Sequence, residues 1–128
     1  MIFDQGPQTC VLVVDDESRM RETLSDILQE YGFDVYEAEN GAQAVATVER
    51  ESIDLVLLDL TMPVMDGATA LREIRTLRPD AKVIIMTAYA HSTALDTAAQ
   101  EGVEAIVLKP LDMEELVSMM RTALKAKE

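Results

Sequence analysis

The stretch Asp54–Gly67, which reads DLVLLDLTMPVMDG, sets the strongest limit on how this chain can fold. Its apolar run over residues 55–58 is too short for a buried helix and is typical of a strand covered on both faces, as in parallel sheets. The run ends at Asp59, and Pro63 then prevents the strand from continuing. We therefore predict that Asp59 lies at the carboxyl end of a central strand, the edge at which open α/β sheets bind their ligands.

The rest of the chain alternates between further strand patterns and amphipathic helices. Short apolar runs predict strands, and apolar residues repeating at helical spacing predict helices. The predicted strands are 10–14, 33–38, 55–58, 82–86 and 104–108, and the predicted helices follow them at 18–31, 40–51, 67–77, 92–101 and 112–124. Strand 33–38 is more polar and is expected at an edge of the sheet. The alanine-rich helix 92–101 has the weakest apolar face and is expected to be the least firmly anchored.

This alternation of strands and helices predicts an α/β fold. The sheet should be mostly parallel, with right-handed crossovers and helices on both faces. The length of 128 residues corresponds to one domain. The sequence lacks GxGxxG, GxxxxGK[ST], HExxH and CxxC, so mononucleotide, zinc and dithiol sites are without their usual signatures.

The charge of the chain limits the partners that it can bind. The sequence has 24 acidic and 11 basic residues, for a formal net charge of −13. This excess repels phosphate backbones and anionic lipids, so we expect no direct binding to nucleic acid or to membranes. Residues 1–8 have no basic residue and no signal-like apolar run, and no segment approaches the ~20 apolar residues of a membrane span. A cytoplasmic protein is expected.

Four of the five predicted strands end in polar side chains. These residues are Asp15 with Asp16, Asp59, Thr87 and Lys109. Parallel strands place their carboxyl ends at one edge of a sheet, so we expect these side chains to gather there. Each has an ordinary explanation by itself, as an acid before a helix, a turn residue, a back-bonded hydroxyl or a solvated charge. Together, those explanations require four unrelated coincidences.

These groups suit phosphoryl transfer assisted by a divalent cation. Carboxylates a few ångströms apart do not all stay ionised without compensation, and Mg²⁺ takes oxygen ligands of this kind. A carboxylate such as Asp59 can attack phosphorus and form an aspartyl phosphate. The Lys109 ammonium can neutralise phosphoryl oxygens, and the Thr87 hydroxyl can donate a hydrogen bond to one of them.

From about Cys10 to Leu124 the sequence resembles the CheY-like receiver domains of two-component response regulators. The motifs that carry the resemblance are VLVVDDE, DLVLLDLTMPVMDG, VIIMTA and VLKP, in this order and at strand ends. The resemblance implies a flavodoxin-like (βα)5 three-layer sandwich with a five-stranded parallel sheet of order 2-1-3-4-5. It also implies a receiver domain over residues 9–126, preceded by a short leader over residues 1–8.

The resemblance further implies a function and a metal site. Asp59 would accept a phosphoryl group from a sensor histidine kinase or a histidine phosphotransfer protein, and the chain would then switch the surfaces that bind a downstream effector. Asp16 and Asp59, with the backbone carbonyl of Thr61, would hold Mg²⁺, while Asp15 would orient metal-bound water. Such a receiver is not an enzyme beyond catalysing its own phosphorylation and dephosphorylation.

The resemblance also gives roles to residues that would lie around the phosphoryl group. Thr87 and Lys109 would bind its oxygens, and the bond between Lys109 and Pro110 is expected to be cis, a minority state for X–Pro bonds. Receivers often carry Tyr or Phe three residues before the lysine, but this chain has Ile106, so no aromatic swing is available. The output is instead expected through the loop after Thr87 and the alanine-rich helix. Tyr89 is either a surface aromatic or a lid that keeps water from the acyl phosphate.

Three other functions share parts of this pattern. A Mg²⁺-dependent phosphatase would use the same nucleophile, but such enzymes carry a second Asp two residues later, where this chain has Thr61. A flavodoxin-like FMN carrier would share the fold, but the acids at 15–17 would repel the ligand phosphate. A phosphate-independent interaction module would keep the fold and lose the site, whereas here every site residue is present.

Overall fold

The computed structural model describes residues 9–60, 67–88 and 93–125. It contains one parallel sheet of five strands in the order β2-β1-β3-β4-β5. The strands are β1 (Cys10–Val14), β2 (Asp34–Ala38), β3 (Leu55–Asp59), β4 (Lys82–Thr87) and β5 (Ala105–Leu108), and the helices are α1 (Ser18–Glu30), α2 (Gly41–Arg50), α3 (Gly67–Leu77), α4 (Thr93–Gln100) and α5 (Met113–Lys125). The flavodoxin-like fold and its strand order are thereby confirmed.

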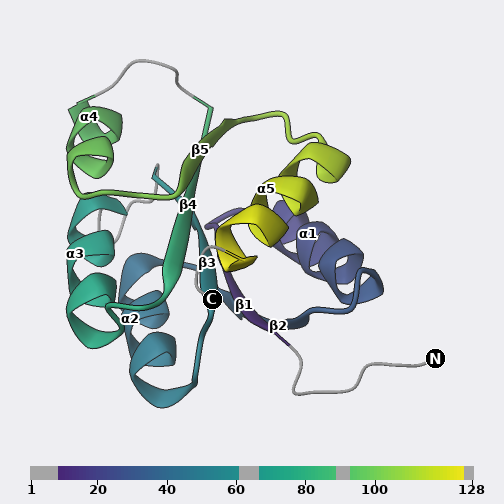
Figure 1. The fold of residues 1–128 in the computed structure, drawn as a ribbon, viewed down its shortest axis with the longest axis horizontal. Helices are drawn as coiled ribbons and strands as arrows, with labels where there is room; N and C mark the ends of the chain where they lie inside the picture. The colour runs from purple at the N-terminus through teal and green to yellow at the C-terminus, as the bar shows by residue number, and fades with distance from the viewer. Residues whose placement is uncertain (1–8, 61–66, 89–92, 126–128) are drawn as a thin grey trace.

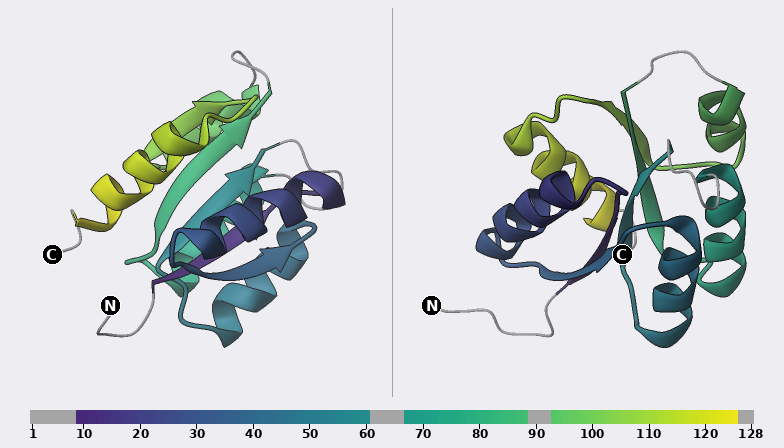
Figure 2. Two further views of the ribbon diagram at one scale, coloured as in Figure 1. Left: turned by 90° about the vertical axis from the view of Figure 1, so that its right-hand side faces the viewer. Right: turned by 180° about the vertical axis from the view of Figure 1, so that it is seen from behind.

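Two layers of helices enclose the sheet. Helices α1 and α5 lie on one face, and α2, α3 and α4 lie on the other (Figures 1 and 2). Side chains along a strand point alternately to the two faces. Leu57 accordingly packs with the α1 and α5 side, whereas Leu58 packs with the α2 and α3 side. β3 is buried along its whole length, which explains its unbroken apolar sequence.

The strand register brings the ends of the strands to one edge. Val14 of β1 pairs with Leu58 of β3, and Leu58 pairs in turn with Ile85 of β4. Thr87 of β4 pairs with Leu108 of β5. The residues that follow these positions therefore stand side by side at the carboxyl edge, toward which the arrowheads point in the left view of Figure 2.

Most predicted element boundaries agree with the structure to within one residue. β2 begins at Asp34 and β5 at Ala105, one residue later than predicted, and α4 ends at Gln100, one residue earlier than predicted. Asn40 caps the start of α2, since its side chain accepts a hydrogen bond of 2.8 Å from the Gln43 N–H. α1 follows Glu17, whose side chain makes no capping hydrogen bond.

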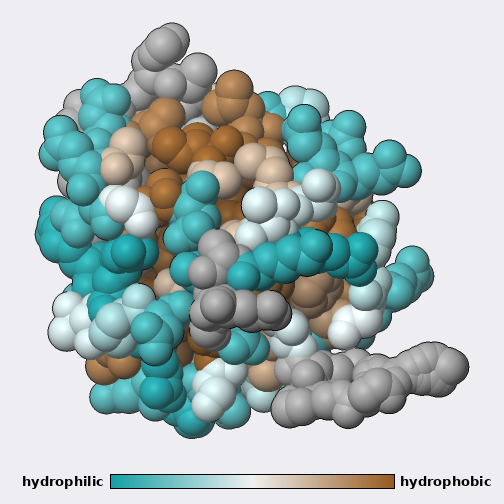
Figure 3. Space-filling view, viewed as in Figure 1, coloured by the Kyte–Doolittle hydropathy of each residue, from teal (hydrophilic) through white to brown (hydrophobic). Residues whose placement is uncertain are grey.

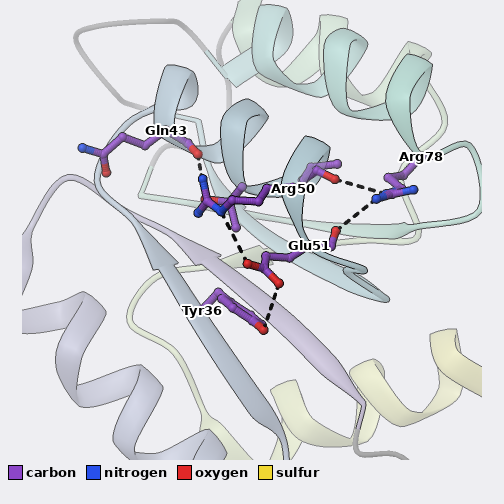
Figure 4. A network of polar contacts seen from close by, with 7 residues as sticks. Tyr36, Gln43, Arg50, Glu51 and Arg78 are labelled. Carbon is purple, nitrogen blue, oxygen red and sulfur yellow. Dashed lines mark hydrogen bonds and ion pairs between the residues drawn. The ribbon is translucent and has the colours of Figure 1, made fainter.

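The carboxyl end of α2 is held by side chains from other elements. Arg78 donates hydrogen bonds of 3.1 Å to the Val48 carbonyl and 3.3 Å to the Glu51 carbonyl (Figure 4). The Tyr36 hydroxyl of β2 donates a 3.3 Å hydrogen bond to the Glu51 carboxylate. These contacts satisfy helix-end carbonyls and fasten α2 to the chain after α3 and to the sheet.

Some apolar residues that the helical patterns placed in the core lie at the surface. Tyr31 and Leu77, each at the last turn of its predicted helix, are exposed. On the edge strand β5, Ile106 is 37% and Leu108 is 50% exposed. Figure 3 shows apolar residues at the surface in the region that β5 occupies in Figure 1. No helix among the described residues is both long enough and apolar enough to cross a membrane.

Candidate functional site

Three carboxylates meet at the carboxyl edge of the sheet. Asp15 and Asp16 follow β1, and Asp59 ends β3, the neighbouring strand. One carboxylate oxygen from each of the three lies within 4.8 Å of the others. Asp15 and Asp59 are each only 1% exposed, whereas Asp16 is open to solvent. The predicted gathering of acids is therefore present, with two acids inside the protein and one at its surface.

Lys109 reaches the same place from the end of β5. Its ammonium lies 3.0 Å from an oxygen of Asp15 and 3.3 Å from an oxygen of Asp59. Its backbone N–H donates a 2.8 Å hydrogen bond to the Thr87 carbonyl, which fixes the start of the loop after β5. The peptide bond between Lys109 and Pro110 is cis, as predicted. One ammonium thus faces three carboxylates.

Burial and the neighbouring charges shift the pKa values of Asp15 and Lys109. Burial raises the pKa of the Asp15 carboxyl, and the charge of Asp59 adds to this, although hydrogen bonds from the Glu17 N–H and from Lys109 oppose it. Burial alone lowers the pKa of Lys109, but its hydrogen bond to Asp15 and the charge of Asp59 outweigh that effect, so the pKa is raised. Lys109 therefore stays charged at neutral pH.

Asp15 is held at every polar atom that it offers. Its N–H donates to the Ala38 carbonyl at 3.1 Å, and its Oδ1 accepts from the Glu17 N–H at 3.0 Å. Its Oδ2 accepts from Lys109, and its backbone carbonyl accepts a 2.8 Å hydrogen bond from Arg21. Arg21 was not predicted from the sequence as a residue of this site. The signal was its position three and seven residues before Leu24 and Leu28, which puts a charged residue in line with the buried face of α1.

Three of the other predicted site residues lie in the described part of the chain. Thr87 is buried at the end of β4, at the same sheet edge as the carboxylates. Ile106 is exposed on β5, and Pro110 follows Lys109 through the cis bond. Thr61 and Tyr89 lie outside the described residues.

The donor set fits a hard divalent cation. All of the grouped ligands are carboxylate oxygens, which suit Mg²⁺ and Ca²⁺ and offer no soft sulfur or imidazole ligand. The exposed Asp16 leaves one side of the group open to solvent. That opening suits Mg²⁺, which usually keeps several of its waters.

Comparisons with known proteins agree with this arrangement. The family model described as the response regulator receiver domain matches residues 11–121. The chain belongs to this family. It is thus a receiver domain of two-component systems, as the resemblance in its sequence indicated. The receiver is 40% identical over 115 residues to the chemotaxis protein CheY of Bacillus subtilis, covering 89% of this chain and 96% of that protein.

Other similar proteins are longer or have solved structures. The receiver is 39% identical over 119 residues to the transcriptional regulatory protein ZraR of Klebsiella oxytoca, covering 93% of this chain but only 27% of that protein. It also resembles the structure of the response regulator protein TrrA of Thermotoga maritima in complex with Mg²⁺-BeF, with 35% identity and a TM-score of 0.82. That match covers 91% of this chain and 99% of TrrA. Receivers of this fold therefore occur both nearly alone and as one part of a longer protein.

Proposed function

We propose that this receiver accepts a phosphoryl group on Asp59 and thereby switches the surface that it offers to an effector. The observation that carries the proposal is the excess of carboxylate over ammonium at one sheet edge. A structural ion pair needs one carboxylate for one ammonium. A second buried carboxylate and a third exposed one add repulsion to the fold, which is explained if the site binds a cation and a phosphoryl group.

The chemical step is an in-line displacement at phosphorus. One oxygen of the Asp59 carboxylate forms a bond to phosphorus while the bond from phosphorus to the donor nitrogen of a phosphohistidine breaks. The departing imidazole keeps the electron pair of that bond. The product is an aspartyl phosphate, and no external oxidant or reductant is required.

The carboxylates also supply the ligands for the cation. Asp16 and Asp59, with the backbone carbonyl of Thr61, would hold Mg²⁺, and Asp15 would orient its water. When bound, Mg²⁺ neutralises charge on the carboxylates and on the phosphoryl oxygens. The support comes from the grouping of the three carboxylates and from the Mg²⁺-BeF complex of the similar protein TrrA.

Lys109 and Thr87 would receive the phosphoryl group. The Lys109 ammonium, 3.3 Å from an oxygen of Asp59, is within reach of an oxygen of the group that Asp59 would carry. It would exchange a contact with the carboxylate for one with the phosphoryl group. Thr87 ends the adjacent strand β4 and would donate its hydroxyl to another phosphoryl oxygen.

The partners follow from this chemistry. The donor would be a sensor histidine kinase or a histidine phosphotransfer protein, and the receiver domain would span residues 9–126. Its catalysis would be limited to its own phosphorylation and dephosphorylation, in the cytoplasm. The net charge of −13 favours an effector protein over nucleic acid or an anionic membrane as the direct target.

The test is to weigh the intact protein after incubation with Mg²⁺ and acetyl phosphate. Wild type should gain the mass of one phosphoryl group, and Asp59→Asn should gain none. Asp80→Asn is a matched control because Asp80 is exposed at a turn after α3. Its phosphorylation should equal that of wild type. Equal labelling of wild type and Asp59→Asn would refute Asp59 as the acceptor.

A further inference from the structure

Arg21 is an arginine of α1 whose guanidinium is largely inside the protein. Its side chain is 12% exposed. One nitrogen, Nη1, donates a 2.8 Å hydrogen bond to the backbone carbonyl of Asp15, and Nε donates a 3.0 Å hydrogen bond to the carboxylate of Glu37. Arg21 therefore joins the loop after β1 to the end of β2.

The carbonyl that Arg21 contacts belongs to the peptide group between Asp15 and Asp16. Because a peptide group is planar, fixing its oxygen also fixes the direction in which the Cα of Asp16 leaves Asp15. The side chain of Asp15 is already held by Lys109 and by the Glu17 N–H. Asp16 is exposed, so its placement depends on the backbone that carries it.

Glu37 gives Arg21 a firm point of attachment. It lies on β2, where it pairs with Val13 of β1, and the next residue, Ala38, accepts a hydrogen bond from the Asp15 N–H. The planar fork of a guanidinium can bond the sheet and the loop at the same time, which a single ammonium does less well. The loop that carries Asp16 is thus tied to the sheet by the Asp15 N–H and by Arg21.

We infer that Arg21 is a positioning residue for the cation site. It holds the peptide group between Asp15 and Asp16 so that the Asp16 carboxylate stands beside Asp15 and Asp59 before the cation arrives. This inference rests on the proposed function. Groups that orient metal ligands in this way commonly affect metal affinity by about 10–100-fold.

Positioning and simple electrostatics predict opposite results for Arg21. The guanidinium is a positive charge next to an acidic site, so its removal should strengthen Mg²⁺ binding if charge alone matters. If Arg21 positions Asp16, its removal should weaken Mg²⁺ binding instead. The sign of the change therefore separates the two roles.

The experiment is calorimetric titration of the full chain with MgCl₂ at low ionic strength. Arg21→Gln should raise the Kd for Mg²⁺ about tenfold or more, and Arg21→Lys should give a smaller increase. Glu37→Gln keeps Arg21 but loosens its attachment, so it should also raise the Kd. Arg19→Gln is the matched control, because Arg19 is an exposed arginine two residues earlier on the same helix. It should leave the Kd unchanged or lower it slightly.

Phosphorylation by acetyl phosphate gives a second readout. In Arg21→Gln the Mg²⁺ concentration for half-maximal rate should rise, while the rate at saturating Mg²⁺ should return close to that of wild type. An unchanged or lower Kd in both Arg21→Gln and Glu37→Gln would overturn the inference and leave the proposed function intact. Failure of wild type to bind Mg²⁺ would overturn both. If Arg21→Gln does not fold, Arg21→Lys decides the matter, because it keeps the positive charge and removes the planar fork.

Discussion

At the scale of single residues, Asp15 shows how the site opposes the stability of the fold. The carboxyl is buried beside Asp59, and burial raises its pKa above the ordinary value of 3.8. The folded state therefore binds this proton more tightly than the unfolded chain does. As the pH rises from the ordinary pKa through the raised one, ionisation of Asp15 costs stability. At pH values above the raised pKa the fold carries that cost in full.

Replacement of Asp15 by asparagine should remove this cost. The amide side chain of the Asp15→Asn variant would keep an oxygen to accept from the Glu17 N–H, and Lys109 would keep its contact with Asp59. We expect Asp15→Asn to unfold at a higher temperature than wild type at pH 7. The difference should shrink as the pH falls through the raised pKa, because a protonated Asp15 and an asparagine both lack charge.

Thermal unfolding at a series of pH values from 7 down to the ordinary pKa of 3.8 measures this difference. All other titrating groups are shared by the two proteins, so the change in the difference with pH reports on Asp15. The exposed Asp80→Asn variant is the control for the loss of one negative charge at the surface. A stability difference that is the same at every pH would contradict the explanation.

The residues of the site were predictable to different degrees. Asp15, Asp59 and Lys109 were accessible to sequence analysis because apolar strand runs end at each of them, and parallel strands end at one edge. Arg21 was not, because its position in line with Leu24 and Leu28 places it on the inner face of α1 but does not show which backbone carbonyl it contacts. Its role depends on the meeting of α1 with the end of β2, which only the folded structure shows.

At the scale of elements, α4 differs from the other helices in how it is attached. It has eight residues, and Leu95 is its one buried side chain among those described. It lies against α3, where Arg72 pairs with Glu101 at 3.3 Å just after the helix end. Such an exposed ion pair contributes only about 0.2–1 kcal/mol. Among the described side chains of α4, apolar burial is therefore limited to Leu95.

We expect α4 to open more readily than the other described helices. Its backbone amides should exchange with deuterium faster than those of α1 and α5, whose buried faces contribute two and four core residues, respectively. Hydrogen exchange measured by NMR at neutral pH gives the opening free energy residue by residue. The amides of α1 serve as the internal reference. Protection in α4 equal to that in α1 would contradict the prediction that α4 is weakly anchored.

The sequence predicts where the strands lie better than it predicts which of their side chains are buried. The strands were predictable because continuous apolar runs identify strands buried on both faces, as in β1, β3 and β4. β5 has the same kind of sequence, yet Ile106 and Leu108 are exposed because β5 is an edge strand. The apolar run of β5 does not by itself show that this strand lies at the edge, which only the strand order implied by the resemblance to receiver domains indicates. Likewise, Tyr31 and Leu77 continue an apolar face past the point where the core ends.

At the scale of the whole molecule, the excess of negative charge affects how any cation will act on stability. A formal net charge of −13 means that salt stabilises the folded chain by screening its self-repulsion. A cation that binds the three grouped carboxylates adds a second, specific contribution. The two contributions must be separated before a rise in stability is attributed to the site.

Mg²⁺ should stabilise this receiver more than an equal ionic strength of NaCl does. A ligand at ten times its Kd that binds only the folded state adds about 1.4 kcal/mol, or roughly 3–6 °C in Tm for a domain of this length. The excess over NaCl should vanish in Asp59→Asn, which removes one charge from the group of carboxylates. Thermal unfolding of both proteins in the two salts measures it. Binding of a cation by the three grouped carboxylates should depend on Asp59. An equal rise in Tm for wild type and Asp59→Asn in both Mg²⁺ and NaCl would therefore mean that only screening of charge stabilises the fold.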